Sequence, residues 1–338
     1  MVCLVAGIGL LAWWIISDSS PAERPSVFDI NGDHPGDLRP GLAFTDNLNH
    51  YGIDVDLPYE VTINTLGFRG GEPATKGAPV VVVLGDSFAF GMGVDTGHTF
   101  PEGLQRALRG THPNAVVHNA AVPGYTITDE LEFWREKLKA LAPDLVLVCH
   151  TASDLKEMAR PTSFRRIVRY DDEEPGPDDP DVERLIAEAG GEKRAVMERH
   201  YIVTQEELLS RLGFERAPEI LRGYLNEYAS KVDELREAIR TSPGAPRFAL
   251  VLWVDGYGMR DLTSQPIRAF AAERGIPLFD GDAALRSHTK VSPDVLFLPD
   301  GHFSSQGNAL VGQQTAAWLR SMDLLDAARP SLGGGKVN

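Results

Sequence analysis

The feature that most constrains this chain is the apolar run Val80–Leu84, which stops directly at the turn Gly85-Asp86-Ser87-Phe88. Consecutive β-branched and aliphatic residues are typical of a strand that is buried on both faces of a parallel sheet. Ligands of open α/β sheets bind at the carboxyl ends of such strands. Ser87 is therefore placed where a nucleophile would be useful, although a Gly-Asp-Ser triplet is also common as an ordinary polar turn.

The rest of the chain alternates predicted strands with predicted helices. Strands are predicted at Val80–Leu84, Ala115–Asn119, Leu145–Cys149, Phe248–Val254 and Pro277–Phe279. Helices are predicted at Phe100–Leu108, Asp129–Leu141, Ile220–Ile239, Thr263–Arg274 and Ser305–Arg320. This βαβα order predicts a parallel sheet that is covered by helices on both faces.

The carboxyl-terminal part of the chain supplies a candidate base for the serine. Asp300-Gly301-His302 follows the apolar segment Val295–Leu298 and precedes a helical stretch. A carboxylate two residues from a histidine on a loop can orient the imidazole, so that its other nitrogen faces the serine. The alternative is a loop histidine whose Asp300 caps the final helix.

Four blocks of sequence together resemble the SGNH (GDSL-like) hydrolase superfamily. In chain order they are Asn64-Thr65-Leu66-Gly67-Phe68-Arg69, Leu84–Phe88, His118–Tyr125 and Asp300-Gly301-His302. The resemblance covers roughly residues 64–156 and 245–322. It implies a three-layer α/β/α, flavodoxin-like sandwich with a central parallel sheet.

The resemblance also implies a role for each site residue. Ser87 is the nucleophile, His302 is the base and Asp300 is the acid that orients it. The backbone N–H groups of Ser87 and Gly124 would form the oxyanion hole. Three further polar residues are expected to contact substrate: Asp86, Asn119 and Asp154. The resemblance implies no metal and no organic cofactor.

Two positions depart from the family pattern. A further family block, which corresponds to His150–Leu155 here, ends in Asn-Asp, whereas this chain has Ser153-Asp154, so a hydroxyl replaces the amide that donates to the oxyanion. Losing such a donor costs about 2.7–4 kcal/mol of transition-state stabilisation. We therefore expect either a slow enzyme that uses Ser153 in its oxyanion hole or a pocket specialised for another ligand. The second departure is that Asp300 lies two residues before His302, as in the branch that contains polysaccharide O-acetyltransferases, although hydrolases show this spacing too.

These residues predict a serine esterase that cleaves an O-acyl ester, short-chain or acetyl, through an acyl-enzyme. The substrate would be a small-molecule, glycan or lipid ester. One alternative is an O-acetyltransferase acting on a cell-surface glycan, and another is a catalytically weak protein that binds carbohydrate or lipid. The formal net charge of −15 argues against a nucleic-acid partner, because binding phosphates needs a concentrated basic face. The sequence leaves the oligomeric state open.

The two cysteines, Cys3 and Cys149, are too few for a disulfide framework. Cys149 falls in an apolar run and is predicted to be a buried strand residue. A catalytic pair of Cys149 with His150 is disfavoured, because neighbours on a strand point to opposite faces.

The N-terminal segment is predicted to be a separate element. Val2–Ile16 is almost wholly apolar and is followed by the polar stretch Ser17–Pro25. It is short for a membrane span, which needs roughly 17–25 residues, and it lacks a basic leader and an obvious cleavage site. Its paired tryptophans suit a membrane interface. We expect residues 1–17 to be a membrane anchor or an uncleaved signal, and to be the only part of the chain that contacts the membrane. The domain would then lie outside the cytoplasm of a bacterium, in the periplasm or at the cell surface.

The remaining boundaries follow from composition and periodicity. Residues 18–63 are predicted to be an irregular leader packed on the domain, 64–325 the SGNH hydrolase-like domain and 326–338 a flexible tail. An insert at about 156–218 leaves the carboxyl end of a predicted strand. It is expected to be either a lid over the site or a solvated excursion.

Overall fold

A parallel sheet of five strands forms the centre of the molecule. The computed structural model describes residues 27–28, 37–51, 55–72, 79–151, 154, 217–253, 264–286 and 293–325. The strands of the sheet are β3 (Val80–Leu84), β4 (Val116–Asn119), β5 (Leu145–His150), β6 (Arg247–Leu252) and β7 (Leu278–Asp280). Their order across the sheet is β4-β3-β5-β6-β7, and every neighbouring pair is parallel.

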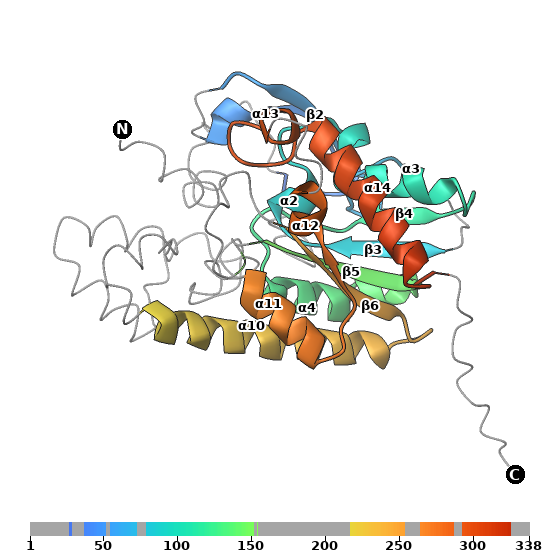
Figure 1. Cartoon of the computed structure of the whole chain (residues 1–338). Coiled ribbons are helices and arrows are strands. Elements are labelled where there is room, and N and C mark those ends of the chain that lie inside the picture. The colour runs from blue at the N-terminus through green and yellow to red at the C-terminus, as the bar shows by residue number, and fades with distance from the viewer. Residues whose placement is uncertain are drawn as a thin grey trace, which may run out of the picture.

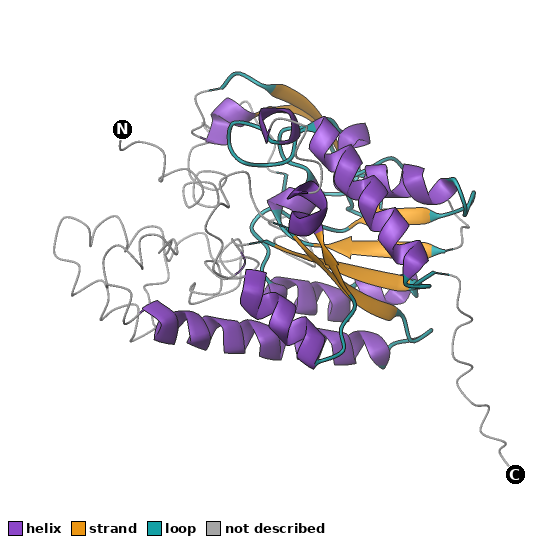
Figure 2. Cartoon of the chain, in the orientation of Figure 1, coloured by secondary structure: helices purple, strands orange, loops and turns teal. Residues whose placement is uncertain are grey.

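Helices cover both faces of this sheet (Figure 1). On one face lie α3 (Phe100–Arg109) and α14 (Ser305–Ser321), and on the other lie α4 (Ile127–Glu136), α10 (Ala217–Arg240) and α11 (Ser264–Glu273). The shorter helices are α2 (Ser87–Phe90), α12 (Gly281–Arg286) and α13 (Pro293–Leu296), with 3-10 turns at Leu48–Tyr51, Thr96–His98 and Leu138–Leu141. Figure 2 shows the resulting three layers. The predicted α/β/α sandwich is therefore confirmed.

The central strands are apolar throughout because both of their faces are covered. Val81–Leu84 of β3 are fully buried, and so is every residue of β5. Leu84 pairs with Val148, so the carboxyl ends of these two neighbouring strands lie at one edge of the sheet. Residues that follow either strand are therefore brought close together.

The strand order reverses at β3, which lies between β4 and β5. After β4 the chain crosses over β3 to reach β5, so the loops that follow these strands leave in different directions. In doubly wound sheets the crevice for ligands opens at this point. Ser87 follows three residues after the end of β3 and therefore lies at this switch point.

Helices α3 and α14 approach closely enough for their backbones to touch. A Cβ added to Gly312 of α14 would lie 2.6 Å from the backbone nitrogen of Leu104 in α3. Only a residue without a side chain permits this contact. The contact fixes α14, and with it the loop that precedes α14.

Part of the segment predicted to be an irregular leader is instead a small antiparallel sheet. Strand β1 (Ala43–Asn47) pairs with β2 (Pro58–Thr62). In β2, Tyr59 and Val61 are buried while their neighbours are exposed, which is the alternation of a half-buried strand. The prediction for residues 18–63 is wrong at these two strands, because five-residue strands are too short to stand out in a stretch rich in Gly, Pro, Asp and Asn.

The five predicted strands and five predicted helices are present, with ends that differ by a few residues. The helix predicted at Asp129–Leu141 is broken at Lys137, whose φ of −126° is not helical. Residues 1–17, residues 156–216 of the insert and the tail 326–338 lie outside the described residues. Among the helices of the described ranges, none combines the length and apolarity that a membrane crossing requires.

Candidate active site

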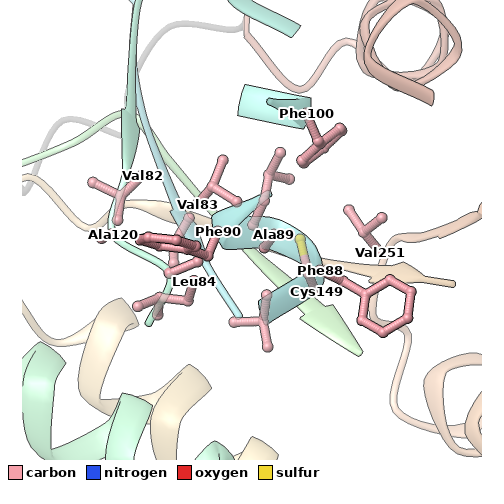
Figure 3. Close-up of a cluster of buried hydrophobic side chains, with 14 of the residues drawn as sticks. Val82, Val83, Leu84, Phe88, Ala89, Phe90, Phe100, Ala120, Cys149 and Val251 are labelled. Carbon is pink, nitrogen blue, oxygen red and sulfur yellow. The ribbon is translucent and has the colours of Figure 1, made fainter. Parts of the chain in front are cut away.

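Ser87 is the first residue of α2, a single helical turn that begins immediately beyond β3. Asp86 caps this helix, because its Oδ1 accepts a hydrogen bond from the Phe88 N–H at 2.9 Å. Gly85 allows the sharp bend between strand and helix, with a φ of +152° and no room for a Cβ, which would lie 2.7 Å from the Ala89 side chain. Ser87 is half-buried, and the next three residues of α2, Phe88, Ala89 and Phe90, lie in a buried apolar cluster (Figure 3).

His302 lies against the serine hydroxyl. Its Nε2 is 2.8 Å from Ser87 Oγ, and its Nδ1 is 2.8 Å from Oδ2 of Asp300. The other Asp300 oxygen accepts a hydrogen bond from the His302 backbone N–H at 3.1 Å. The structure therefore brings together the three residues that were predicted to act together, in the arrangement of a serine–histidine–acid triad.

The loop that carries the histidine is fixed by its own backbone and by α14. Leu298 N–H donates to the His302 carbonyl at 2.7 Å, and Gly301 N–H donates to the Leu298 carbonyl at 2.9 Å. Ser304 caps α14, since its Oγ accepts from Gly307 N–H at 3.1 Å. The alternative in which Asp300 caps the final helix is therefore not what the structure has.

Electrostatics favour an ionised Asp300. Burial by itself would raise the pKa of this carboxyl and is the largest single influence, but the charge of His302 and its side-chain and backbone hydrogen bonds together outweigh burial and lower the pKa. An ionised carboxylate at Nδ1 places the N–H of the imidazole on that side. Nε2 is then left as the acceptor that faces Ser87.

The loop after β4 is tied to the turn that carries the serine. Val122 N–H donates to the Gly85 carbonyl at 3.0 Å, and Gly124 follows in a turn with a φ of +83°. This places the predicted oxyanion glycine next to the nucleophile loop. Ser153, the third predicted donor, lies outside the described residues. The oxyanion roles of Ser87, Gly124 and Ser153 stay predictions.

The three predicted substrate contacts have partners inside the protein. Asp86, Asn119 and Asp154 are at most 3% exposed. Asp86 Oδ2 accepts from Thr151 Oγ1 at 2.9 Å, Asn119 Nδ2 donates to the Phe90 carbonyl at 3.2 Å, and Asp154 Oδ2 accepts from Thr151 N–H at 2.6 Å. These hydrogen bonds indicate that the three residues hold the loops of the site in place, which is a different role from the predicted contact with substrate.

A buried polar cluster behind these loops was not predicted from the sequence. Both carboxylate oxygens of Glu130 are buried without a hydrogen-bond partner among the described residues. Burial raises the pKa of Glu130 well above its usual range, and Asp154, Asp86 and Asp129 raise it further. Both influences favour the neutral form of this carboxyl. Its position three residues after the buried Ile127, on the inner stripe of α4, is the feature of the sequence that could have indicated its burial.

The neighbouring His150 and Cys149 are not poised for catalysis. His150 is fully buried, and burial lowers its pKa to about 3, so the ring is neutral although its Nδ1 lies 3.5 Å from Asp154 Oδ2. Burial also raises the pKa of the Cys149 thiol well above its usual range, which disfavours a reactive thiolate. Among the described residues, no three His, Cys, Asp or Glu side chains come together as a metal site.

Residues 83–310 match the GDSL-like lipase/acylhydrolase family. A comparison with curated proteins finds no match. A structure described as a lipolytic protein of the G-D-S-L family from Desulfitobacterium hafniense DCB-2 is similar over 71% of this chain and 99% of that chain, with 15% identity and a TM-score of 0.44. Axe2, an acetylxylan esterase from Geobacillus stearothermophilus, is similar over 72% and 95%, with 15% identity and a TM-score of 0.42. A two-domain esterase active on acetylated mannans is similar over 75% and 51%, with 14% identity and a TM-score of 0.45.

Proposed function

Because the chain belongs to the GDSL-like lipase/acylhydrolase family, we propose that it is a serine esterase that cleaves an O-acyl ester through an acyl-enzyme. The observation that carries the proposal is the unbroken line of hydrogen bonds from Ser87 Oγ through the two ring nitrogens of His302 to Asp300. A serine hydroxyl is a weak nucleophile at its free pKa, and an adjacent base of this kind activates it.

The proposed reaction has two halves. Ser87 Oγ attacks the acyl carbonyl carbon while His302 Nε2 takes the hydroxyl proton, and the resulting oxyanion is held by backbone N–H groups of Ser87 and Gly124. When the intermediate collapses, the ester C–O bond breaks and His302 protonates the leaving alcohol. A water then loses a proton to His302 and attacks the acyl-enzyme. When this second intermediate collapses, the bond to Ser87 Oγ breaks and His302 returns the proton to that oxygen, which releases the carboxylic acid and restores Ser87. Asp300 holds the ring and stabilises the imidazolium in both halves.

The acyl group is proposed to be short, acetyl above all, on a glycan, lipid or small-molecule alcohol. The proposal is tested with p-nitrophenyl esters of increasing chain length, each with and without an acetylatable oligosaccharide. We expect turnover to be highest with the acetate and to be lost in Ser87→Ala. We also expect a fluorophosphonate probe to label Ser87. Turnover that depends on the oligosaccharide would identify an acetyltransferase. Neither turnover nor labelling would leave a binding protein.

The cellular location is proposed from the sequence alone. An apolar Val2–Ile16 with two tryptophans would anchor the chain and hold the esterase outside the cytoplasm. Fractionation of cells that make the full chain and a variant lacking residues 1–17 tests this. We expect the full chain in the membrane fraction, accessible to protease in spheroplasts, and the shortened chain in the soluble fraction. A full chain in the cytosol would overturn the proposal.

A further inference from the structure

Arg69 is buried against the carboxyl end of the nucleophile helix, although it precedes the region 83–310 that matches the family. The residue is only 1% exposed. The guanidinium donates hydrogen bonds to the backbone carbonyls of Phe90, Gly91 and Val94. Phe90 is the last residue of α2, and the other two lie in the loop that continues from it. Arg69 thus binds three backbone carbonyls within the five residues 90–94, just after the turn that carries Ser87.

Two of these carbonyls, those of Phe90 at the end of α2 and of its C-cap Gly91, are groups that a helix cannot satisfy by itself. The last carbonyls of any helix lack an intrahelical partner, and the positive charge of an arginine at that end is favourable. The guanidinium carbon also lies 4.5 Å from the centre of the Phe90 ring, within the range of a cation–π contact. A helix of four residues is too short to set its own direction, so contacts at its ends must do so.

The loop that Arg69 holds is hydrogen-bonded to the nucleophile itself. The N–H groups of Gly91 and Met92 donate to the Ser87 carbonyl at 3.0 and 3.1 Å. The chain of contacts from Arg69 to Ser87 therefore contains one intervening residue. The turn that carries Ser87 is therefore held at its start by the Asp86 cap and at its end by this loop.

Arg69 is in turn held by two other parts of the fold. Its backbone N–H donates to the Asn119 carbonyl at 3.1 Å at the end of β4, and the Asn119 side chain donates to the same Phe90 carbonyl that Arg69 binds. A guanidinium nitrogen lies 3.3 Å from the Glu60 carbonyl in β2. The small β1–β2 sheet is therefore connected to the nucleophile helix through one side chain.

We infer that Arg69 is a positioning residue for Ser87, which keeps the serine hydroxyl within reach of His302 Nε2 by fixing the loop behind α2. It touches neither the substrate nor the reacting atoms. The inference rests on the proposed function, since it takes Ser87 as the nucleophile. Displacing a reacting group by about 1 Å can cost a factor on the order of 10² in rate.

The test compares Arg69→Met and Arg69→Lys with wild type and with Ile239→Ala. Met keeps much of the apolar stem and removes all the donors, whereas Lys keeps a charge but presents its donors on one nitrogen in place of the planar guanidinium fork. Ile239 is fully buried in α10, remote from the site, so its truncation lowers stability alone. Each protein is assayed well below its own Tm for kcat and KM on p-nitrophenyl acetate and for the rate of fluorophosphonate labelling.

We expect Arg69→Met to lower both kcat and the labelling rate by on the order of 10² with KM nearly unchanged, Arg69→Lys to be intermediate, and Ile239→Ala to keep the wild-type kcat. Hydrogen exchange at the amides of Gly91 and Met92 should be faster in the Arg69 variants than in Ile239→Ala. If the Met variant does not fold, the Lys variant decides both readouts. A wild-type kcat in folded Arg69 variants would overturn the inference. Absence of turnover and labelling in wild type would instead overturn the proposed esterase function. The exchange rates would still test whether Arg69 fixes the loop behind α2.

Discussion

The hydroxyl of Thr151 lies 2.9 Å from Oδ2 of Asp86 and joins the loop after β5 to the residue that caps the nucleophile helix. Thr151 is fully buried and Asp86 is 2% exposed. Because the other Asp86 oxygen binds the Phe88 N–H, a single carboxylate connects the starting turn of α2 with the neighbouring strand.

Thr151→Val should therefore destabilise the protein. The substitution keeps the volume but removes a buried hydrogen bond to a charged group, which is worth about 1.5–3 kcal/mol. Urea unfolding of Thr151→Val and Thr151→Ser measures the difference, since serine retains the hydroxyl. Equal stability of the two variants would show that the bond contributes nothing.

Asp300→Asn should leave the fold intact and remove most of the activity. The amide has nearly the shape of the carboxylate but lacks the charge that stabilises the imidazolium, and its N–H₂ group would favour the wrong tautomer of His302. In serine proteases such a change lowers kcat on the order of 10⁴-fold. Steady-state kinetics with Ser87→Ala as the inactive limit measures the loss. A variant with more than a tenth of the wild-type kcat would show that Asp300 does not orient the base.

Glu130→Gln should stabilise the protein increasingly as the pH rises. Burial raises the folded-state pKa of Glu130, with smaller contributions from Asp154, Asp86 and Asp129, so the folded protein keeps a proton that the unfolded chain releases above about 4.5. Below that pH both states are protonated and the substitution has little effect. Above it the wild type loses stability relative to the variant, until the pH passes the raised pKa and the difference becomes constant.

Melting curves of wild type and Glu130→Gln from pH 4 to pH 9 measure this difference. Glu136→Gln is the matched control, because Glu136 is an exposed residue at the end of the same helix. We expect the gain in Tm to grow with pH only for the Glu130 variant. A constant gain, or one that shrinks as the pH rises, would mean that Glu130 is ionised in the folded state.

The parts of the fold that could be predicted are those that a short window of sequence specifies. The apolar run Val80–Leu84 suffices to predict a doubly covered parallel strand, and His302 is recognisable because its acid lies two residues away. Arg69 could be assigned to a family block but not to a role, because its partners are backbone carbonyls some twenty residues later and carry no side-chain pattern. The spacing of α4 could have indicated that Glu130 is buried, but not that Asp86 and Asp154, which are distant in sequence, lie near it.

Ser153 is predicted to stand where the family has its oxyanion asparagine, and it is the position at which the proposed function is most exposed to test. The residue lies outside the described residues, while its neighbours Thr151 and Asp154 are hydrogen-bonded to each other behind the nucleophile. If Ser153 is a short donor to the oxyanion, Ser153→Asn should raise kcat on p-nitrophenyl acetate, because an amide that reaches the developing charge stabilises the transition state more than the ground state. A rise of about tenfold corresponds to about 1.4 kcal/mol.

If the pocket is shaped around the smaller side chain for transfer or binding, asparagine should crowd it and lower activity or affinity. Ser153→Ala is the control and should lose activity in the esterase case; an unchanged kcat in both variants would place Ser153 away from the reacting carbonyl.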